Sequence, residues 1–166
     1  MEVILRRVSS GHDVTQLAML ADEIWHQHFI TILSEDQIDY MVDKFQSAPA
    51  MTKQMVNEGY EYYFILVDGE EVGYTGIKND LYKLFLSKLY LRKEHRGKGY
   101  ASAVFEHLKD ICRNRNLTSI WLTVNRYNED TIAVYKKKGF EVIRTQVADI
   151  GEGYVMDDYV MELKLS

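Results

Sequence analysis

The sequence has little cysteine, little proline and no long apolar run, and each shortage excludes a class of protein. A single cysteine, Cys112, rules out an internal disulfide framework and is typical of a chain kept in a reducing cytoplasm. A single proline and 12% aromatic residues argue against a disordered chain. The longest apolar stretches, such as Tyr62–Val67, are too short to span a bilayer. Residues 1–7 alternate apolar and charged side chains, unlike the apolar core of a signal peptide. We therefore expect a cytoplasmic protein that has no membrane partner.

A basic excess is also missing. The chain has 20 Lys and Arg against 25 Asp and Glu, a net charge of −5, which argues against a nucleic-acid partner. The motifs H-E-x-x-H, C-x-x-C and G-x-S-x-G do not occur, so we predict neither a metal site nor a serine hydrolase. The 166 residues carry no repeat or linker, and we predict a single domain over 1–166 that buries its own core.

Apolar periodicity predicts the order of strands and helices. Strands are expected at residues 2–8, 62–67, 71–78, 84–91, 119–124, 140–145 and 154–164. Helices are expected after Asp13 as N-cap (with Gln16 three residues on), after Ser34, at 49–58, at 100–115 and at 128–138. Antiparallel hairpins flanking one strand–helix–strand crossover predict an α/β (α+β) fold, with a mixed, mostly antiparallel central sheet of about seven strands and flanking helices.

A loop with two glycines follows the strand at 84–91. Gly97 and Gly99 let the backbone turn so that successive N–H groups point inward, and a helix begins at once. Unpaired amides at the positive end of a helix form an anion site suited to phosphate, and Arg96 and Lys98 add positive charge. The alternative is a plain glycine turn with solvated basic side chains.

Two other phosphate loops are excluded. A Walker loop needs G-x-x-x-x-G-K-[ST], which does not occur. A dinucleotide fingerprint needs glycine or alanine where Ser102 stands, and an acidic residue at the end of the next strand, which instead ends Thr123-Val124-Asn125.

Two segments resemble one known family. Arg96-Gly97-Lys98-Gly99-Tyr100-Ala101 matches the R-x-x-G-x-G/A motif of the GNAT superfamily, the acetyl-CoA-dependent N-acetyltransferases. Residues 128–140 are similar to its second signature, an asparagine, a tyrosine seven residues later and then Gly-Phe. The two segments occur in the family's order within a compatible strand layout. The resemblance implies the acyl-CoA N-acyltransferase (GNAT) fold, with acetyl-CoA in the split between the strands at 84–91 and 119–124.

The resemblance also implies roles for individual residues. Backbone groups of Leu89, Tyr90 and Leu91 would pair with the pantetheine arm beside a β-bulge. The pyrophosphate would lie on Arg96, Gly97, Lys98, Gly99, Tyr100, Ala101 and Ser102. Asn128 would bind the pantetheine arm, although its position also fits a simple helix N-cap. Tyr135 would protonate the departing thiolate as the catalytic residue, although it also fits the apolar face of its helix.

The general base and the acceptor site are less defined. Many relatives carry a glutamate in the strand before the phosphate loop, but Leu84–Leu89 contains no carboxylate. Candidates near the acceptor are Trp25 and His28 in the first helix and Asp157 and Asp158 near the last strand, with His26 also considered as a base. The simpler interpretations are partly exposed histidines and a solvated acid pair. If the acid pair lies near the cleft, it favours a cationic amine.

The resulting hypothesis is an N-acetyltransferase that uses acetyl-CoA as cosubstrate and no metal. The acetyl group would pass directly to a primary amine in a ternary complex, and the acceptor would be a polyamine-like metabolite, an amino acid or a protein amine. We expect a monomer or a homodimer. A catalytically silent acyl-CoA-binding sensor is the alternative, because the strand glutamate is missing. An acetyltransferase toxin acting on charged tRNA is a third, which the acidic balance opposes.

Overall fold

The computed structural model describes residues 2–165 as seven strands, five α-helices and one short 3-10 helix. The strands are β1 (Val3–Arg7), β2 (Tyr60–Val67), β3 (Glu70–Asp80), β4 (Lys83–Leu91), β5 (Ser119–Asn125), β6 (Glu141–Gly151) and β7 (Tyr154–Lys164). The helices are α1 (Gly11–Phe29), α2 (Glu35–Gln46), α3 (Ala48–Asn57), α4 (Tyr100–Arg115) and α5 (Glu129–Lys137), with the 3-10 helix η1 at Lys93–His95. Within residues 2–165 no helix has both the length and the apolarity of a membrane span.

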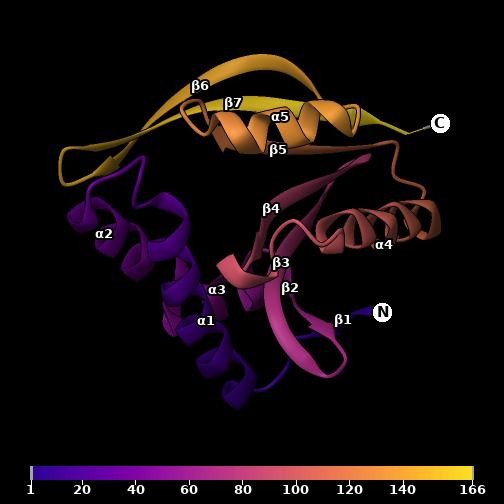
Figure 1. Cartoon of the computed structure of the whole chain (residues 1–166), viewed down its shortest axis with the longest axis horizontal. Helices are drawn as coiled ribbons and strands as arrows, with labels where there is room; N and C mark the ends of the chain where they lie inside the picture. Colours follow the sequence, from indigo (N-terminus) through magenta and orange to yellow (C-terminus); the bar gives the residue numbers. More distant parts are fainter. Residues whose placement is uncertain (1, 166) are drawn as a thin grey trace.

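The strands form one sheet in the order β1-β2-β3-β4-β5-β7-β6. Every neighbouring pair is antiparallel except β4 and β5, which are parallel. A parallel pair needs a crossover connection, and α4 supplies it (Figure 1). The predicted mixed, mostly antiparallel sheet with flanking helices is confirmed.

The parallel pair is short, and this opens the centre of the sheet. β4 and β5 pair only over Lys83–Phe85 and Ser119–Trp121. The register between β3 and β4 also changes, because Lys88 lies opposite Gly76 whereas Leu86 lies opposite Ile77. Ser87 is therefore left without a partner, as in a β-bulge. Strands β4 and β5 separate beyond this point, and the second half of β4 presents an unpaired edge toward β5.

Helices cover both faces of the sheet with separate cores. Buried side chains of α1, α2 and α3, such as Leu17, Ile38 and Met51, pack on one face. Buried side chains of α4 and α5, such as Leu108 and Ile132, pack on the other. In Figure 1, α1 and α2 lie to the left of the strands and α4 to the right. Burial of each such side chain contributes about 1.5–3 kcal/mol, so both cores hold the sheet halves in place around the split.

Two sequence predictions about element ends are wrong. Asp13 is not the N-cap of the first helix: Ser10 is, and its hydroxyl accepts the backbone N–H of Asp13 at 3.1 Å. The Asp13 carboxylate instead accepts backbone N–H groups of Ser9 and Ser10, so a capping box forms one turn earlier. The strand predicted to end at Thr145 continues to Gly151, because pairing with the long strand β7 extends it.

The extended β6–β7 hairpin reaches helix α2. The Tyr40 hydroxyl donates to the carbonyl of Ile150 at 2.7 Å, and the Lys44 ammonium donates to the same carbonyl. Gln37 Nε2 donates to the carbonyl of Val155 at 3.1 Å. These contacts join the two halves of the sheet across the split.

Candidate active site

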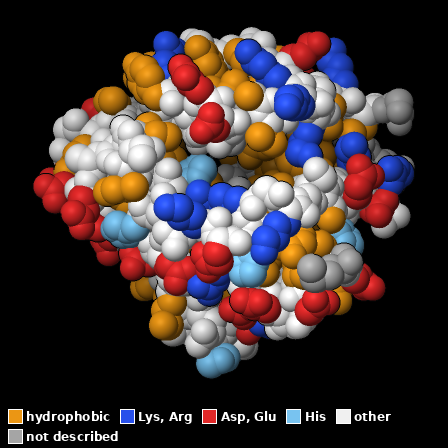
Figure 2. Space-filling model, in the orientation of Figure 1, with side chains coloured by type: hydrophobic (Ala, Val, Ile, Leu, Met, Phe, Trp, Pro, Cys, Tyr) orange, Lys and Arg blue, Asp and Glu red, His pale blue; other side chains and the backbone are white. Residues whose placement is uncertain are grey.

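A cavity of about 390 Å³ lies between the separating strands β4 and β5. Figure 2 shows a hollow in this face of the molecule, with Lys and Arg side chains close to it. Most of the predicted site residues line the cavity: Trp25, His28, Leu89, Tyr90, Leu91, Arg96, Gly97, Gly99, Tyr100, Ala101, Ser102, Asn128, Tyr135 and Asp158. Lys98 and Asp157 are not in the lining.

The glycine loop forms one end of the cavity. Gly97 and Gly99 have φ values of +75° and +83°, which favour glycine. Gly99 is the N-cap of α4 and provides no side-chain cap. A Cβ atom at Gly97 or Gly99 would meet no heavy atom within 4 Å, so the space above the loop is open. Arg96 Nε donates to the carbonyl of Leu91 at 3.1 Å and ties the loop to the end of β4.

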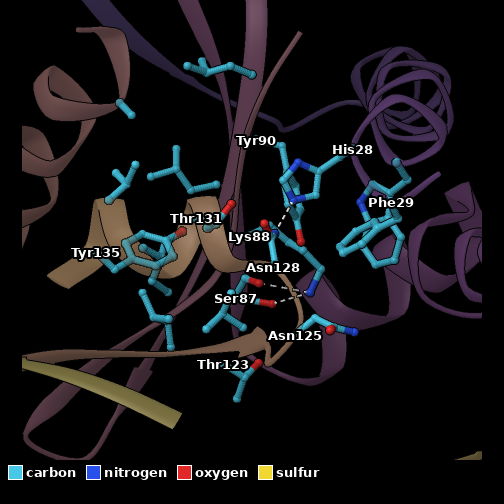
Figure 3. A pocket seen from close by; sticks show the side chains of 18 of the residues that line it. His28, Phe29, Ser87, Lys88, Tyr90, Thr123, Asn125, Asn128, Thr131 and Tyr135 are labelled. Atoms are coloured by element: carbon cyan, nitrogen blue, oxygen red, sulfur yellow. Dashed lines mark hydrogen bonds between the residues drawn. The ribbon is translucent and has the colours of Figure 1, made fainter. Parts of the chain in front are cut away.

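Asn128 and His28 meet in the middle of the cavity, from α5 and α1 (Figure 3). Asn128 is buried, and its side chain does not cap α5. Its Nδ2 lies 2.9 Å from His28 Nε2. Burial, with a smaller effect of the Arg96 charge, lowers the pKa of His28 to about 4. The imidazole is therefore neutral near pH 7, and its Nε2 accepts a hydrogen bond from the Asn128 amide.

Tyr135 lines the cavity from α5. Its ring packs against Phe105 and Phe140, with ring centroids 6.0 Å and 5.5 Å away. Its hydroxyl has no hydrogen-bond partner among residues 2–165. Burial raises the pKa of Tyr135 to about 12, so the hydroxyl keeps its proton and has it available for donation.

Asp157 and Asp158 have different surroundings. They lie on β7 rather than in a solvated loop. Asp157 forms an ion pair with Arg126, with 2.7 Å between Oδ1 and Nε. Asp158 is 4% exposed and lines the cavity. Burial and, secondarily, the charge of Asp157 raise the pKa of Asp158 to about 6, while Lys88 opposes the shift.

Lys88 is a cavity residue that the sequence did not single out. Its Nζ donates to Ser87 Oγ at 2.8 Å and to the Ser87 carbonyl at 3.2 Å (Figure 3). Burial lowers the pKa of Lys88 to about 8, and Asp158 opposes this shift. The sequence contains one indirect indication of a role for this strand, which is that it lacks the expected carboxylate. The bulge at Ser87 interrupts the alternation of side chains, so periodicity did not indicate that Lys88 faces the cavity.

The other two candidates from the first helix, His26 and Trp25, have different positions relative to the cavity. His26 points away from the cavity and pairs with Asp39, with 2.6 Å between Nε2 and Oδ1. Trp25 is 3% exposed, and its indole N–H donates to the Tyr74 hydroxyl at 2.7 Å. Trp25 therefore forms part of the cavity wall, with its polar group engaged in the core.

A comparison with protein families decides the assignment. The model of the acetyltransferase (GNAT) family matches residues 17–140. The chain belongs to the GNAT acetyltransferase family. It is thus an N-acetyltransferase by family, and the resemblance noted in the two motifs is confirmed.

Individual relatives agree with this assignment. An uncharacterized N-acetyltransferase of Mycobacterium tuberculosis is 27% identical over 154 residues, 92% of this chain and 98% of the relative. The solved structure of the PaiA N-acetyltransferase of Thermoplasma acidophilum with coenzyme A has a TM-score of 0.80 at 23% identity, covering 99% and 100% of the two chains. The ribosomal-protein-S18-alanine N-acetyltransferase of Escherichia coli has a TM-score of 0.72 at 16% identity, covering 99% and 95%. Likeness to these structures establishes the GNAT fold for this chain.

The cavity of this GNAT protein suits acetyl-CoA. The space above Gly97 and Gly99 is open, and β4 has no β5 partner at Leu89–Leu91, so an N-terminal helix end and a free strand edge are both available to a cofactor with phosphate and amide groups. Among residues 2–165, no group of three His, Cys, Asp or Glu side chains is placed to hold a metal ion.

Proposed function

We propose that this GNAT protein transfers the acetyl group of acetyl-CoA to a primary amine by direct attack in a ternary complex. The observation that carries the proposal is that one cavity joins the glycine loop, the unpaired edge of β4, Tyr135 and Asp158. In the proposed reaction, the groups for anion binding, arm binding, proton donation and proton acceptance would thus share one continuous space.

Binding and orientation come from the loop and the strand edge. Acetyl-CoA supplies the acetyl group as an activated thioester. The N–H groups of the loop and of the α4 N-terminus would hold its pyrophosphate, and Leu89 and Leu91 would pair with its pantetheine arm. Asn128 would bind the same arm, in an orientation fixed by His28. Holding both reactants in one geometry supplies much of the rate enhancement.

Two protons must move during the transfer. An alkyl ammonium has a pKa of about 10.4 and must lose a proton before its nitrogen attacks. Asp158, ionised above a pKa of about 6, accepts this proton in place of the missing strand glutamate. The departing thiolate gains a proton from the Tyr135 hydroxyl. Neither the positive charge of the attacking nitrogen nor the negative charge of the leaving sulfur then accumulates in the cavity.

Release of free CoA thiol in the presence of an amine tests this function. Purified protein is incubated with acetyl-CoA and a panel of primary amines, and the thiol is followed with a chromogenic reagent. We expect amine-dependent release that exceeds slow hydrolysis. Acetyl-CoA binding by calorimetry without release for any amine would instead support the sensor interpretation.

A further inference from the structure

Two side chains of opposite charge face the same end of the cavity. Lys88 comes from β4 and Asp158 from β7, on the two sides of the split. Their charges interact, yet no ion pair within 4.0 Å joins them among the pairs in residues 2–165. Opposite charges that face a shared space without contact leave room for a ligand between them.

Asp158 has no partner of its own. Its carboxylate is in a side chain that is 4% exposed, and it forms no hydrogen bond or ion pair with residues 2–165. Its neighbour Asp157 is already neutralised by Arg126. A buried and unpartnered carboxylate is costly in the free protein, so a cationic ligand group is favoured there.

Lys88 is held at its position by the bulge. The Thr75 hydroxyl, fully buried, donates to the Lys88 carbonyl at 2.7 Å. Among residues 2–165, the Lys88 ammonium is bound only by the carbonyl and hydroxyl of Ser87, both uncharged. The cation therefore lacks a neutralising partner in this described part of the chain, and an anionic ligand group is favoured beside it.

Much of the cavity lining is apolar. It includes Phe29, Leu33, Met41, Leu86, Val155 and Met156, beside the polar side chains of Gln37, Thr123 and Asn125. The contacts of Gln37 with Val155 and of Tyr40 with Ile150 bridge this end of the cavity. A partly apolar space bridged in this way suits a small ligand with an apolar side chain.

We propose that the acceptor is a free α-amino acid with an apolar side chain, whose ammonium group lies on Asp158 and whose carboxylate lies on Lys88. This inference rests on the proposed acetyl transfer and names its acceptor class. It differs from the expectation of a cationic amine such as a polyamine, because the sequence pattern indicated Asp157 and Asp158 but gave no reason to place Lys88 opposite them. The product is the N-acetylated amino acid, with free CoA and one proton released.

Matched pairs of acceptors test the proposal. Each amino acid is compared with the amine that lacks only its carboxylate: L-leucine with isoamylamine, L-methionine with 3-(methylthio)propylamine and L-phenylalanine with phenethylamine, with spermidine added as a polycation. We expect kcat/KM for the best amino acid to exceed that of its matched amine at least ~10-fold, because a site that pairs a polar group rejects the analogue without it. Equal or better turnover of the decarboxylated amines or of spermidine would overturn the proposal.

Substitution of Lys88 identifies the carboxylate partner. Lys88→Met should lower kcat/KM for the amino acid at least ~10-fold more than that of the matched amine, which loses only the effect of the Lys88 charge on Asp158, while Lys88→Arg keeps part of the preference. Lys53→Met, which removes an exposed lysine on α3 outside this cavity, is the matched control. Equal losses for both acceptor classes in Lys88→Met would contradict the proposal.

The two proposals fail in different ways. Release of CoA with amines of either class but without the predicted preference removes only the acceptor assignment. No release with any amine removes acetyl transfer itself. If Lys88→Met fails to bind acetyl-CoA, the wild-type comparison of matched pairs still decides the question.

Discussion

The side-chain amide of Asn128 donates a hydrogen bond to the neutral Nε2 of His28 across 2.9 Å. This contact joins the start of α5 to the last turn of α1, on opposite faces of the sheet. It fixes the orientation of the Asn128 amide, whose oxygen takes no part in this contact. We therefore predict that His28 acts as a positioning residue for Asn128, the asparagine proposed to bind the cofactor.

Removing either partner should weaken acetyl-CoA binding. We expect Asn128→Ala and His28→Ala each to raise the Kd about 5–10-fold, the value of about one hydrogen bond. The double variant should show less than the sum of the two losses, which calorimetry can measure as a coupling energy. His26→Ala is the matched control, since His26 pairs with Asp39 outside the cavity. Additive losses in the double variant would argue against the positioning role.

Gly99→Val should abolish tight acetyl-CoA binding. A β-branched side chain is strained at a φ of +83° and fills the open space above the loop. Gly69→Val provides a matched control, because Gly69 has a φ of +80° and the same open surroundings but lies in the β2–β3 turn. Both variants should lose similar stability in thermal unfolding. If they also bind acetyl-CoA equally well, the phosphate-loop assignment is wrong.

Tyr135→Phe should lower kcat by about 10²-fold or more, in line with the loss of a general acid. Acetyl-CoA affinity should hardly change, because the ring contacts with Phe105 and Phe140 remain. Tyr127→Phe, which changes a tyrosine that is 66% exposed and outside the cavity, should keep full activity. The comparison requires conditions in which chemistry limits turnover, and an unchanged kcat there would leave Tyr135 with a packing role alone.

The fold was predictable from the sequence, and most residues that the sequence suggests for the cofactor end line one cavity, for local reasons. The glycine loop, the helix start and the residues just after Asn128 are short segments. Their conformation and chemistry can be inferred from the local sequence alone. Their association with β4 and β5 followed from the single crossover. The acceptor end was less predictable, because it depends on contacts between distant segments. Arg126 directly follows β5, so its ion pair with Asp157 depends on the pairing of β5 with β7. The placement of Lys88 opposite Asp158 arises only when β4 and β7 flank the same cavity.

Activity with an amino acid acceptor should have a bell-shaped pH dependence. Asp158 must be ionised to take the ammonium, so kcat/KM should rise as pH increases through about 6. Lys88 must be charged to hold the carboxylate, so kcat/KM should fall as pH increases through about 8. His28, with a pKa of about 4, titrates below this window. The alkaline limb should disappear in Lys88→Arg, whose guanidinium stays charged, and persistence of that limb would mean that Lys88 is not its origin.

Asp158 should also make the free energy of unfolding of the ligand-free protein depend on pH. Its carboxyl pKa is raised by burial from 3.8 to about 6 in the folded protein. The folded state therefore binds the proton more tightly than the unfolded state, and stability is lost as pH rises from about 4 to above 6. Because the side chain keeps some contact with solvent in the cavity, we take this loss as about 1–2 kcal/mol rather than the full value of the shift.

Asp158→Asn should remove that loss and stabilise the protein at neutral pH while reducing its activity. In a domain of this size, about 1–2 kcal/mol corresponds to an increase in Tm of about 3–6 °C. The gain should be largest at pH 7 and shrink toward pH 4, where the folded-state carboxyl is protonated and the unfolded-state carboxyl, with a pKa of 3.8, is partly protonated. Asp157→Asn should have the opposite effect, since it breaks the ion pair with Arg126. Thermal unfolding of the three proteins between pH 4 and 7 measures these differences. A pH-independent gain for Asp158→Asn would show that packing rather than the buried charge is responsible. A lower Tm at pH 7 would mean that the Asp158 carboxylate stabilises the ligand-free protein and is not an unpaired charge that a ligand neutralises.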